Sequence, residues 1–274
     1  MVSVPNVVLN NGIEIPQLGF GVFQVDDERT TGAVLSALDA GYRSIDTAAV
    51  YGNEAGVGRA LASSGLPRED LFITTKLWNA QQGYDSTLAA FDASLDKLGL
   101  DHVDLYLIHW PAPARGLYTE TWRAMEKLLA EGRARSIGVS NFQPAHLRRL
   151  AEESGVVPAV NQVELHPGLQ QADLRAFHAG HSIATEAWSP LAQGALLDEE
   201  AITEIARRHE KTPAQVVLRW HLQLGNIVIP KSVTPARIRE NIDVFDFELA
   251  DTDMDAMATL DRGMRMGPDP DVQN

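Results

Sequence analysis

The chain lacks cysteine, and each of its shortages excludes a class of structure or partner. Without cysteine, its 274 residues can form no disulfide, no thiolate zinc site and no cysteine nucleophile. Basic residues are few beside acidic ones, 23 against 37, so the formal net charge is −14. Nucleic acids and anionic membranes bind clustered positive charge, so neither is an expected partner. An anionic ligand would need a local group of basic residues working against the overall field.

Long apolar runs and leader signals are also missing. No stretch approaches the roughly 18 apolar residues that a membrane-spanning helix requires. Residues 1–10 lack the basic and apolar regions of a signal peptide, so we expect a cytoplasmic protein. No linker or low-complexity tract divides the chain, and we expect a single domain over residues 1–274.

What is present is an alternation of short apolar runs with segments of helical spacing. The runs lie at residues 18–22, 44–46, 72–76, 103–109, 136–139, 159–162, 183–188 and 227–230. Strands that alternate with helices form parallel βαβ units. Eight of them favour a closed (β/α)8 TIM barrel, an α/β fold, over an open doubly wound sheet, which stays the alternative.

The two ends of the chain stand outside this alternation. Two short β-type runs, within residues 7–15, flank Asn11-Gly12, a strong signal for a tight N-terminal β-hairpin. Residues 263–274 carry Gly, Pro and Asp without periodicity and predict a short, irregular C-terminal tail. Such a tail usually frays, although in a barrel it could lie over the mouth.

Four polar residues fall where apolar runs end. Asp46, Lys76 and His109 end the second, third and fourth runs, and Tyr51 lies in the loop after Asp46. Each alone has an ordinary explanation as a cap, a surface ion pair, a core histidine or a surface tyrosine. In a barrel, however, the active site lies at the C-terminal ends of the strands, so these four side chains should converge.

Together they suit proton donation to a carbonyl oxygen. Tyrosine holds its proton at neutral pH, and a neighbouring ammonium makes the hydroxyl a better acid. Asp46 would keep Lys76 charged and in place, while His109 would orient the carbonyl or relay the proton. General acids of this kind contribute about 10²–10⁴ in rate.

Carbonyl reduction also needs a hydride donor, yet no Gly-x-Gly-x-x-Gly follows a strand. Residues 52–58 have the wrong spacing and are typical of a helix start. After the last run, Lys231 and Ser232 precede Thr234-Pro235, which predict a helix N-terminus with Arg237 one turn in. Helix N-termini bind phosphate, and barrels often keep a phosphate site beside their last strands. A solvated basic helix start is the alternative.

Several segments resemble those of the aldo-keto reductases. They read GYRSIDTA at 41–48, YGNE at 51–54, DLYLIHWP at 104–111, GVSNF at 138–142, NQVELHP at 161–167 and IPKSV at 229–233. The resemblance runs in order from the hairpin to about residue 261. It implies an NADPH-dependent oxidoreductase that reduces aldehydes and ketones to alcohols. Trp188, where many members have tyrosine, resembles the prokaryotic 2,5-diketo-D-gluconate reductase branch.

The resemblance also implies roles for individual residues. The catalytic tetrad would be Asp46, Tyr51 as the proton donor, Lys76 and His109. The nicotinamide would be held by Ser140, Asn141, Gln162 and the ring of Trp188, and the pyrophosphate by Ser189, Leu191 and Gln193. The 2′-phosphate site would comprise Lys231, Ser232, Val233 and Arg237, with Glu240 and Asn241 near the adenine. An arginine there suits bidentate phosphate binding and favours NADPH over NADH.

The substrate would be a small carbonyl compound, and no metal is expected. Phe23, Trp78, His109 and Trp110 would line an apolar pocket that excludes water. The brief loop after His109 and the short tail indicate an open pocket and broad tolerance, and argue against steroids. Diketo sugar acids, aldehydes, keto esters, dicarbonyls and prochiral ketones all stay open. No apolar stripe marks an interface, so a monomer is expected.

Three other functions remain open at this point. Lys76 at a strand end is also typical of Schiff-base aldolases, although its pairing with Asp46 argues against that role. A metal-dependent hydrolase lacks the His-x-His expected after the first strand, and His178 and His181 are expected to be solvated. A non-catalytic nucleotide sensor would share the fold, because a fold does not determine a function.

Overall fold

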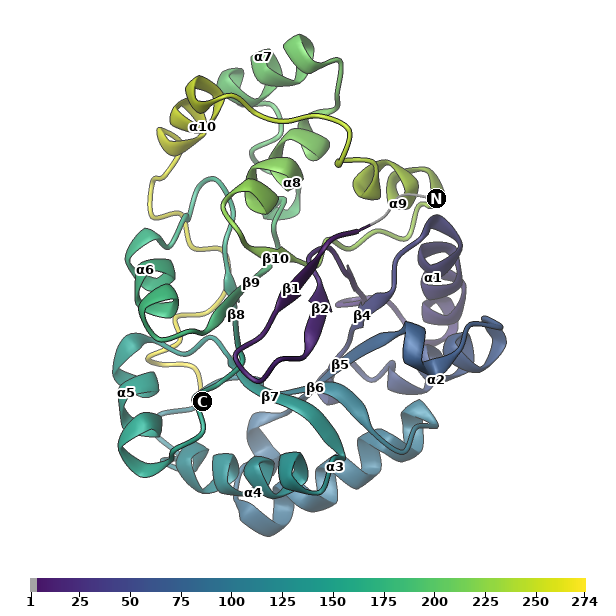
Figure 1. Cartoon of the computed structure of the whole chain (residues 1–274), viewed down its shortest axis with the longest axis vertical. Helices are drawn as coiled ribbons and strands as arrows, with labels where there is room; N and C mark the ends of the chain where they lie inside the picture. Colours follow the sequence, from purple (N-terminus) through teal and green to yellow (C-terminus); the bar gives the residue numbers. More distant parts are fainter. Residues whose placement is uncertain (1–3) are drawn as a thin grey trace.

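Eight parallel strands form the centre of the computed structural model, which describes residues 4–274 (Figure 1). Residues 1–3, part of the segment in which no signal peptide is predicted, lie outside the described residues. In sheet order, which is also chain order, the strands are β3 (Phe20–Gly21), β4 (Ser44–Asp46), β5 (Phe72–Leu77), β6 (Val103–Ile108), β7 (Ala134–Ser140), β8 (Val160–Glu164), β9 (Ala184–Trp188) and β10 (Ile227–Val228).

The first and last strands close the sheet on itself. Leu18 bridges Val228 in parallel, and the Gly19 amide donates to the Val228 carbonyl at 2.8 Å. The prediction of a (β/α)8 barrel is therefore confirmed, and the open-sheet alternative is wrong. The predicted runs agree with the strands because both faces of a parallel sheet are buried, which makes each strand almost continuously apolar.

Helices surround the barrel (Figure 1). They are α1 (Asp27–Ala40), α2 (Glu54–Ser63), α3 (Tyr84–Leu98), α4 (Tyr118–Ala130), α5 (Pro144–Glu153), α6 (Ala172–Gly180), α7 (Glu200–His209), α8 (Pro213–Gln223), α9 (Pro235–Ile242) and α10 (Asp251–Ala258). Their inner faces follow the helical period: Phe91, Leu95 and Leu98 of α3 are all buried. No helix within residues 4–274 is long and apolar enough to cross a membrane.

The N-terminal hairpin closes one end of the barrel. It pairs β1 (Asn6–Val8) with β2 (Glu14–Pro16). Leu9 and Ile15 pack in one apolar cluster with Phe72, where β5 begins. The predicted hairpin is confirmed, and its turn is a three-residue loop that contains Asn11-Gly12. The Gly12 amide donates to the Leu9 carbonyl, and only Gly12 takes a positive φ, 82°, as in a three-residue loop.

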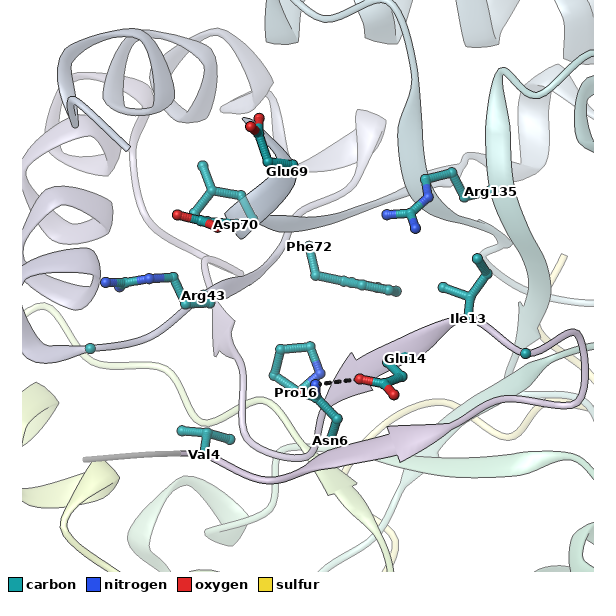
Figure 2. A pocket seen from close by; sticks show the side chains of 13 residues that line it. Val4, Asn6, Ile13, Glu14, Pro16, Arg43, Glu69, Asp70, Phe72 and Arg135 are labelled. Carbon is teal, nitrogen blue, oxygen red and sulfur yellow. Dashed lines mark hydrogen bonds between the residues drawn. The ribbon is translucent and has the colours of Figure 1, made fainter. Parts of the chain in front are cut away.

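A cavity of about 630 Å³ lies beside this hairpin (Figure 2). Its lining includes Phe72 together with Arg43 and Arg135. Because these residues lie at or next to the starts of strands, the cavity is at the opposite end of the barrel from the strand C-termini. The end of the barrel at the strand C-termini is called its mouth below.

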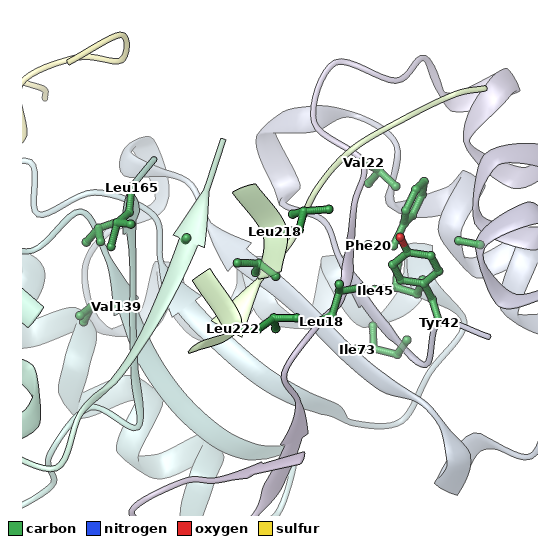
Figure 3. Close-up of a cluster of buried hydrophobic side chains, with 14 of the residues drawn as sticks. Leu18, Phe20, Val22, Tyr42, Ile45, Ile73, Val139, Leu165, Leu218 and Leu222 are labelled. Carbon is green, nitrogen blue, oxygen red and sulfur yellow. The ribbon is translucent and has the colours of Figure 1, made fainter. Parts of the chain in front are cut away.

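One extended apolar core binds strands to helices, and part of it is drawn in Figure 3. It joins Leu18 and Ile45 of the barrel wall to Leu218 and Leu222 of α8. Full burial of each such side chain contributes about 1.5–3 kcal/mol. The barrel wall is thus held rigidly, which fixes the positions of the residues at its mouth.

The C-terminal tail is irregular, as expected, but it is not frayed. Beyond α10 the Met264 amide donates to the Gly168 carbonyl at 2.8 Å. Glu164, buried at the end of β8, accepts from the Gly267 amide at 2.9 Å. At the last residue, Asn274 Oδ1 accepts from the Ala114 amide at 2.7 Å. The tail therefore lies along one side of the mouth, anchored to several of its loops.

Candidate active site

A buried ion pair lies in the mouth of the barrel. Lys76 Nζ donates to Asp46 Oδ1 at 2.6 Å and to the Thr47 carbonyl at 2.9 Å. The adjacent strands β4 and β5 bring the two side chains together, and both are almost fully buried. Burial alone would lower the pKa of Lys76, but Asp46 and nearby Tyr51 and Glu186 raise it above its ordinary value. Lys76 is thus held as an ammonium.

Tyr51 is the proton-bearing group beside this ammonium. It ends the short 3-10 helix η1 (Ala49–Tyr51), and its ring centroid lies 5.2 Å from Lys76 Nζ. Burial raises the pKa of Tyr51, Lys76 lowers it, and Asp46 raises it, with a net rise. The expected acidifying effect of Lys76 is present but outweighed by burial. Tyr51 therefore keeps its proton at neutral pH.

His109 follows β6 and is packed among aromatic rings. Its ring centroid lies 5.7 Å from that of Tyr51 and 5.4 Å from that of Trp78, both edge-on. Burial, with a smaller effect of Lys76, holds the pKa of His109 well below its usual value. The imidazole is therefore neutral. Its Nδ1 is buried and has no hydrogen-bond partner among residues 4–274.

The aromatic residues expected around the substrate do gather here. Phe23 lies 5.0 Å from Tyr51 between ring centroids, and Trp110 stacks at 6.5 Å on His109. Phe23 is 51% exposed, unlike the buried Trp110, so it forms an accessible edge of the wall. Apolar walls around a polar centre strengthen its electrostatic interactions by excluding water.

Three strand ends carry a connected set of amides and rings. Asn141, in the left-handed region at φ 63°, donates to the His109 carbonyl at 3.0 Å. Its Oδ1 accepts from Trp188 Nε1 at 2.8 Å, while Ser140 Oγ donates to the Gln162 carbonyl at 2.8 Å. Asparagine tolerates this backbone conformation better than most residues. The bonds fix Ser140, Asn141 and Trp188 relative to His109.

Gln162 connects this set to the ion pair. Its Nε2 donates to Asp46 Oδ2 and to Glu186 Oε2, both at 2.9 Å. Glu186, on β9, is a buried carboxyl that the sequence predictions missed. The signal is a carboxylate within the apolar run 183–188, but the run does not show which side chains face inward.

The loop after β9 is strained, which fits a segment that positions a ligand. Ser189, Ala192 and Gln193 take positive φ angles of 49°, 47° and 53°. Side chains other than glycine, asparagine and aspartate rarely adopt this region, and such strain concentrates at functional sites. This strained loop follows Trp188 directly and contains the residues predicted to bind the pyrophosphate, Ser189, Leu191 and Gln193.

The predicted phosphate-binding residues lie around the start of α9. Lys231 and Arg237 are exposed, and neither forms an ion pair within residues 4–274. Ser232 Oγ accepts from the Thr234 amide at 3.1 Å, which shapes the turn before the helix. The structure thus leaves two positive charges free at a helix N-terminus, with Val233 between them and partly buried.

Glu240 and Asn241, which lie further along α9, have different surroundings. Glu240 Oε1 accepts from Thr212 Oγ1 at 2.8 Å, at the start of α8. Asn241 is buried. Glu240 is half-buried with one oxygen engaged within the protein, so of the two residues predicted near the adenine it is the more accessible.

Comparison with known proteins decides the family. A model described as "Aldo/keto reductase family" matches residues 17–262. "Methylglyoxal reductase DkgA" of Yersinia pestis is 55% identical over 274 residues, 99% of this chain and 98% of the relative. "Glyoxal reductase" of Bacillus subtilis is 54% identical over 266 residues, 97% and 96% of the two chains. The chain belongs to the aldo/keto reductase family.

A solved structure supports this assignment. A mutant of Gox0644 in complex with NADPH superposes on this reductase with a TM-score of 0.96, at 50% identity over 99% of each chain. The predicted resemblance is confirmed, and the relatives named DkgA agree with the prokaryotic branch that Trp188 indicates. This protein is thus an oxidoreductase of carbonyl groups.

The cavity beside the hairpin contains none of the reductase's predicted site residues (Figure 2). Its two arginines are already bonded: Arg43 Nη1 donates to the Leu38 and Tyr42 carbonyls, and Arg135 Nη1 donates to Asp104 at 2.7 Å. Both arginines are therefore part of the scaffold, and the predicted chemistry lies at the other end of the barrel.

One expectation about histidines is wrong. His178 is fully buried instead of solvated, and its ring nitrogens contact Asn161 and Thr185 at 2.9 Å each. Burial lowers the pKa of His178 to about 4, so it is a neutral core residue. Among residues 4–274 no group of three or more His, Asp or Glu side chains could hold a metal ion.

Proposed function

We propose that this reductase uses NADPH to reduce small aldehydes and ketones to alcohols, with Tyr51 as the general acid. The observation that carries the proposal is the buried Lys76–Asp46 pair beside the Tyr51 and His109 rings. Removing a charged pair from water costs free energy, so its presence here indicates that its geometry serves the site. The pairing also disfavours an aldolase, because an ammonium held by a carboxylate is not a nucleophile.

The chain's own residues divide the proton chemistry among themselves. Tyr51 Oη gives its proton to the carbonyl oxygen as the alcohol forms. Lys76 stabilises the resulting phenolate, and Asp46 keeps Lys76 charged. Neutral His109 orients the carbonyl by a hydrogen bond, since its ring adds no competing charge. When bound, NADPH supplies the hydride that reaches the carbonyl carbon.

The residues present fit this cofactor. Ser140, Asn141 and Gln162 are polar, buried and fixed by mutual bonds, as a site for a carboxamide requires. The orphaned Nδ1 of His109 leaves a buried polar atom available in the mouth. Lys231 and Arg237 would bind the 2′-phosphate at the start of α9, helped by its helix dipole. The NADPH held by Gox0644 supports the same assignment.

The substrate class we propose is small and reactive: α-dicarbonyls such as methylglyoxal, with keto esters and diketo sugar acids as related candidates. The names of the Yersinia pestis and Bacillus subtilis relatives support dicarbonyls. The anchored tail leaves the Phe23 side of the mouth accessible, which suits small molecules entering from that side. We also propose that the reductase acts as a monomer, because Asp46, Tyr51, Lys76 and His109 meet without a second copy.

The test is NADPH oxidation against a panel of dicarbonyls, aldehydes and ketones, with Tyr51→Phe in parallel. We expect turnover by the wild type, a loss of about 10²–10⁴ in kcat for the variant, and preference for NADPH over NADH. Arg237→Ala should remove that preference by raising KM for NADPH alone. Tight NADPH binding without turnover of any carbonyl would instead support the nucleotide-sensor alternative.

A further inference from the structure

Glu186 is a buried acid in the barrel interior for which the proposed chemistry has no use. It lies on β9, opposite Gln162 of β8 in the register, and is 1% exposed. Its Oε2 accepts from Gln162 Nε2 at 2.9 Å. On its other side, the register partner on β10 is Ile227, which carries no charge. Gln162 is therefore the neighbour through which Glu186 contacts the site.

Gln162 is fully engaged on its nitrogen side. An amide nitrogen has two hydrogens, and both are used: one on Asp46 Oδ2, one on Glu186 Oε2. The amide thus cannot turn over without losing two buried bonds. Its oxygen, Oε1, is left as the only group that Gln162 can offer to a ligand. A carboxamide NH₂ would find an acceptor there, and a carboxamide oxygen would not.

The charges around Glu186 are unbalanced. The groups that face it are Asp46 from β4, Lys76 from β5 and Tyr51 from η1, with neutral Gln162 from β8. Lys76 is the one cation of this cluster, and it is already bonded to Asp46. If Glu186 ionised, two buried carboxylates would share one ammonium. The excess negative charge would raise the pKa of Tyr51 further.

We propose that Glu186 is a positioning residue of this reductase: as a neutral acid it holds the Gln162 amide with its oxygen toward the cofactor and leaves the Lys76 charge to Asp46 and Tyr51. The inference rests on the proposed function. Burial and the nearby Asp46 raise the pKa of Glu186 to about 7. Above that pH the acid ionises, the Tyr51 hydroxyl becomes harder to deprotonate, and proton transfer to the substrate slows.

Two variants separate the two proposed roles of Glu186, which are to hold the Gln162 amide and to stay uncharged beside Lys76. Glu186→Gln keeps an acceptor for Gln162 but cannot ionise, and Glu186→Leu removes the acceptor. We expect kcat of the wild type to fall severalfold from pH 6 to pH 8, and Glu186→Gln to lose that fall. Glu186→Leu should weaken NADPH binding about tenfold, roughly the loss of one buried hydrogen bond. Dissociation constants are measured by quenching of tryptophan fluorescence.

Thr185→Val is the matched control. Thr185 is the preceding residue of β9, and its hydroxyl contacts His178 instead of the barrel interior. We expect it to keep the wild-type pH profile and the wild-type affinity for NADPH. A similar change in this variant would mean that any alteration of β9 perturbs the site, and the positioning role would be overturned.

A titration of the cofactor-free protein keeps this test independent of turnover. The ultraviolet difference between each protein and its Tyr51→Phe counterpart isolates the ionisation of Tyr51. Glu186→Gln should move that ionisation to lower pH. If wild type and Glu186→Gln titrate alike and share one kcat–pH profile, the inference on Glu186 is wrong while the reductase function stands. If no carbonyl is reduced but the Tyr51 titration shifts, the proposed function fails and the coupling of Glu186 to Tyr51 survives.

Discussion

Both ends of the barrel bury an acidic side chain, but they balance its charge differently. Asp104 near the hairpin pairs with two partly exposed arginines, whereas Asp46 in the mouth pairs with the fully buried Lys76. Beside the hairpin, the cavity of about 630 Å³ is also lined by Glu69 and Asp70, which are exposed. In the mouth, Asp46, Lys76 and Glu186 are all buried; Lys76 bonds to Asp46 directly, and Gln162 links Asp46 to Glu186. Solvated charges hardly influence one another, whereas buried ones shift each other's pKa. Burial and coupling, not the size of a hollow, therefore mark the candidate site.

The largest effect should follow from Lys76→Met. It leaves Asp46 buried without its cation, which costs about 3–5 kcal/mol of unfolding free energy. Tyr51 also loses the group that stabilises its phenolate, so kcat/KM should fall by about 10³-fold. Urea unfolding and steady-state kinetics measure both. If the variant kept kcat/KM within tenfold of the wild type, the buried pair in the mouth would matter no more for activity than the charges at the hairpin end.

A smaller effect is expected from Gly267→Ala in the tail. A Cβ at this position would overlap the Trp188 ring, so the tail or the ring must move. Because Trp188 is the proposed stacking partner of the nicotinamide, the dissociation constant for NADPH should rise severalfold. Gly155→Ala, where a Cβ meets no atom within 4 Å, is the matched control. If the wild type, Gly267→Ala and Gly155→Ala bound NADPH with equal affinity, the tail would not influence the cofactor site.

Stability should depend on pH through Glu186. Its pKa is raised to about 7 in the folded protein, from about 4.3 in an unfolded chain. Its contribution is therefore complete below about pH 4.3 and is lost as the pH rises through about 7. Relative to Glu186→Gln, the wild type should lose about 5 °C in Tm between pH 5 and pH 8. Parallel Tm curves would show that Glu186 does not titrate in this range.

The smallest effect is expected at the hairpin end, from Arg135→Met. Asp104 is buried as deeply as Asp46, but it has a second cation, Arg68, at 2.7 Å. Arg135 is also partly exposed, so its loss should cost at most about 1 kcal/mol and leave kcat unchanged. Urea unfolding beside Lys76→Met compares the two ends directly. A cost equal to that of Lys76→Met would show that the two ends of the barrel depend equally on their ion pairs.

Much of this molecule could be read from local patterns. The runs at 44–46 and 183–188 correspond closely to β4 (Ser44–Asp46) and β9 (Ala184–Trp188), because a strand buried on both faces is apolar throughout. The position of Asp46 and His109 at the ends of runs was enough to predict that they meet, since parallel strands end together. The roles of the cofactor-binding residues rested on the family resemblance and stay predictions.

Other features depended on contacts that no local pattern encodes. Asn11-Gly12 marked the hairpin, but the pairing of Leu9 with Ile13 set the length of its loop; His178 is buried in contact with Asn161 and Thr185. The anchored tail needed Glu164, which lies about a hundred residues earlier in the chain.

Spacing and side-chain type are local properties, so they were enough to predict alternating strands and helices, to favour a closed barrel over an open sheet, and to predict that Asp46, Tyr51, Lys76 and His109 meet. The folded chain was needed to close the barrel and to show which charges are buried, that Asp46 and Glu186 share Gln162, and that burial affects the pKa of Tyr51 more than Lys76 does. The reason is physical: hydration and coupling between charges are set by the atoms around them, and those come together only when the barrel closes.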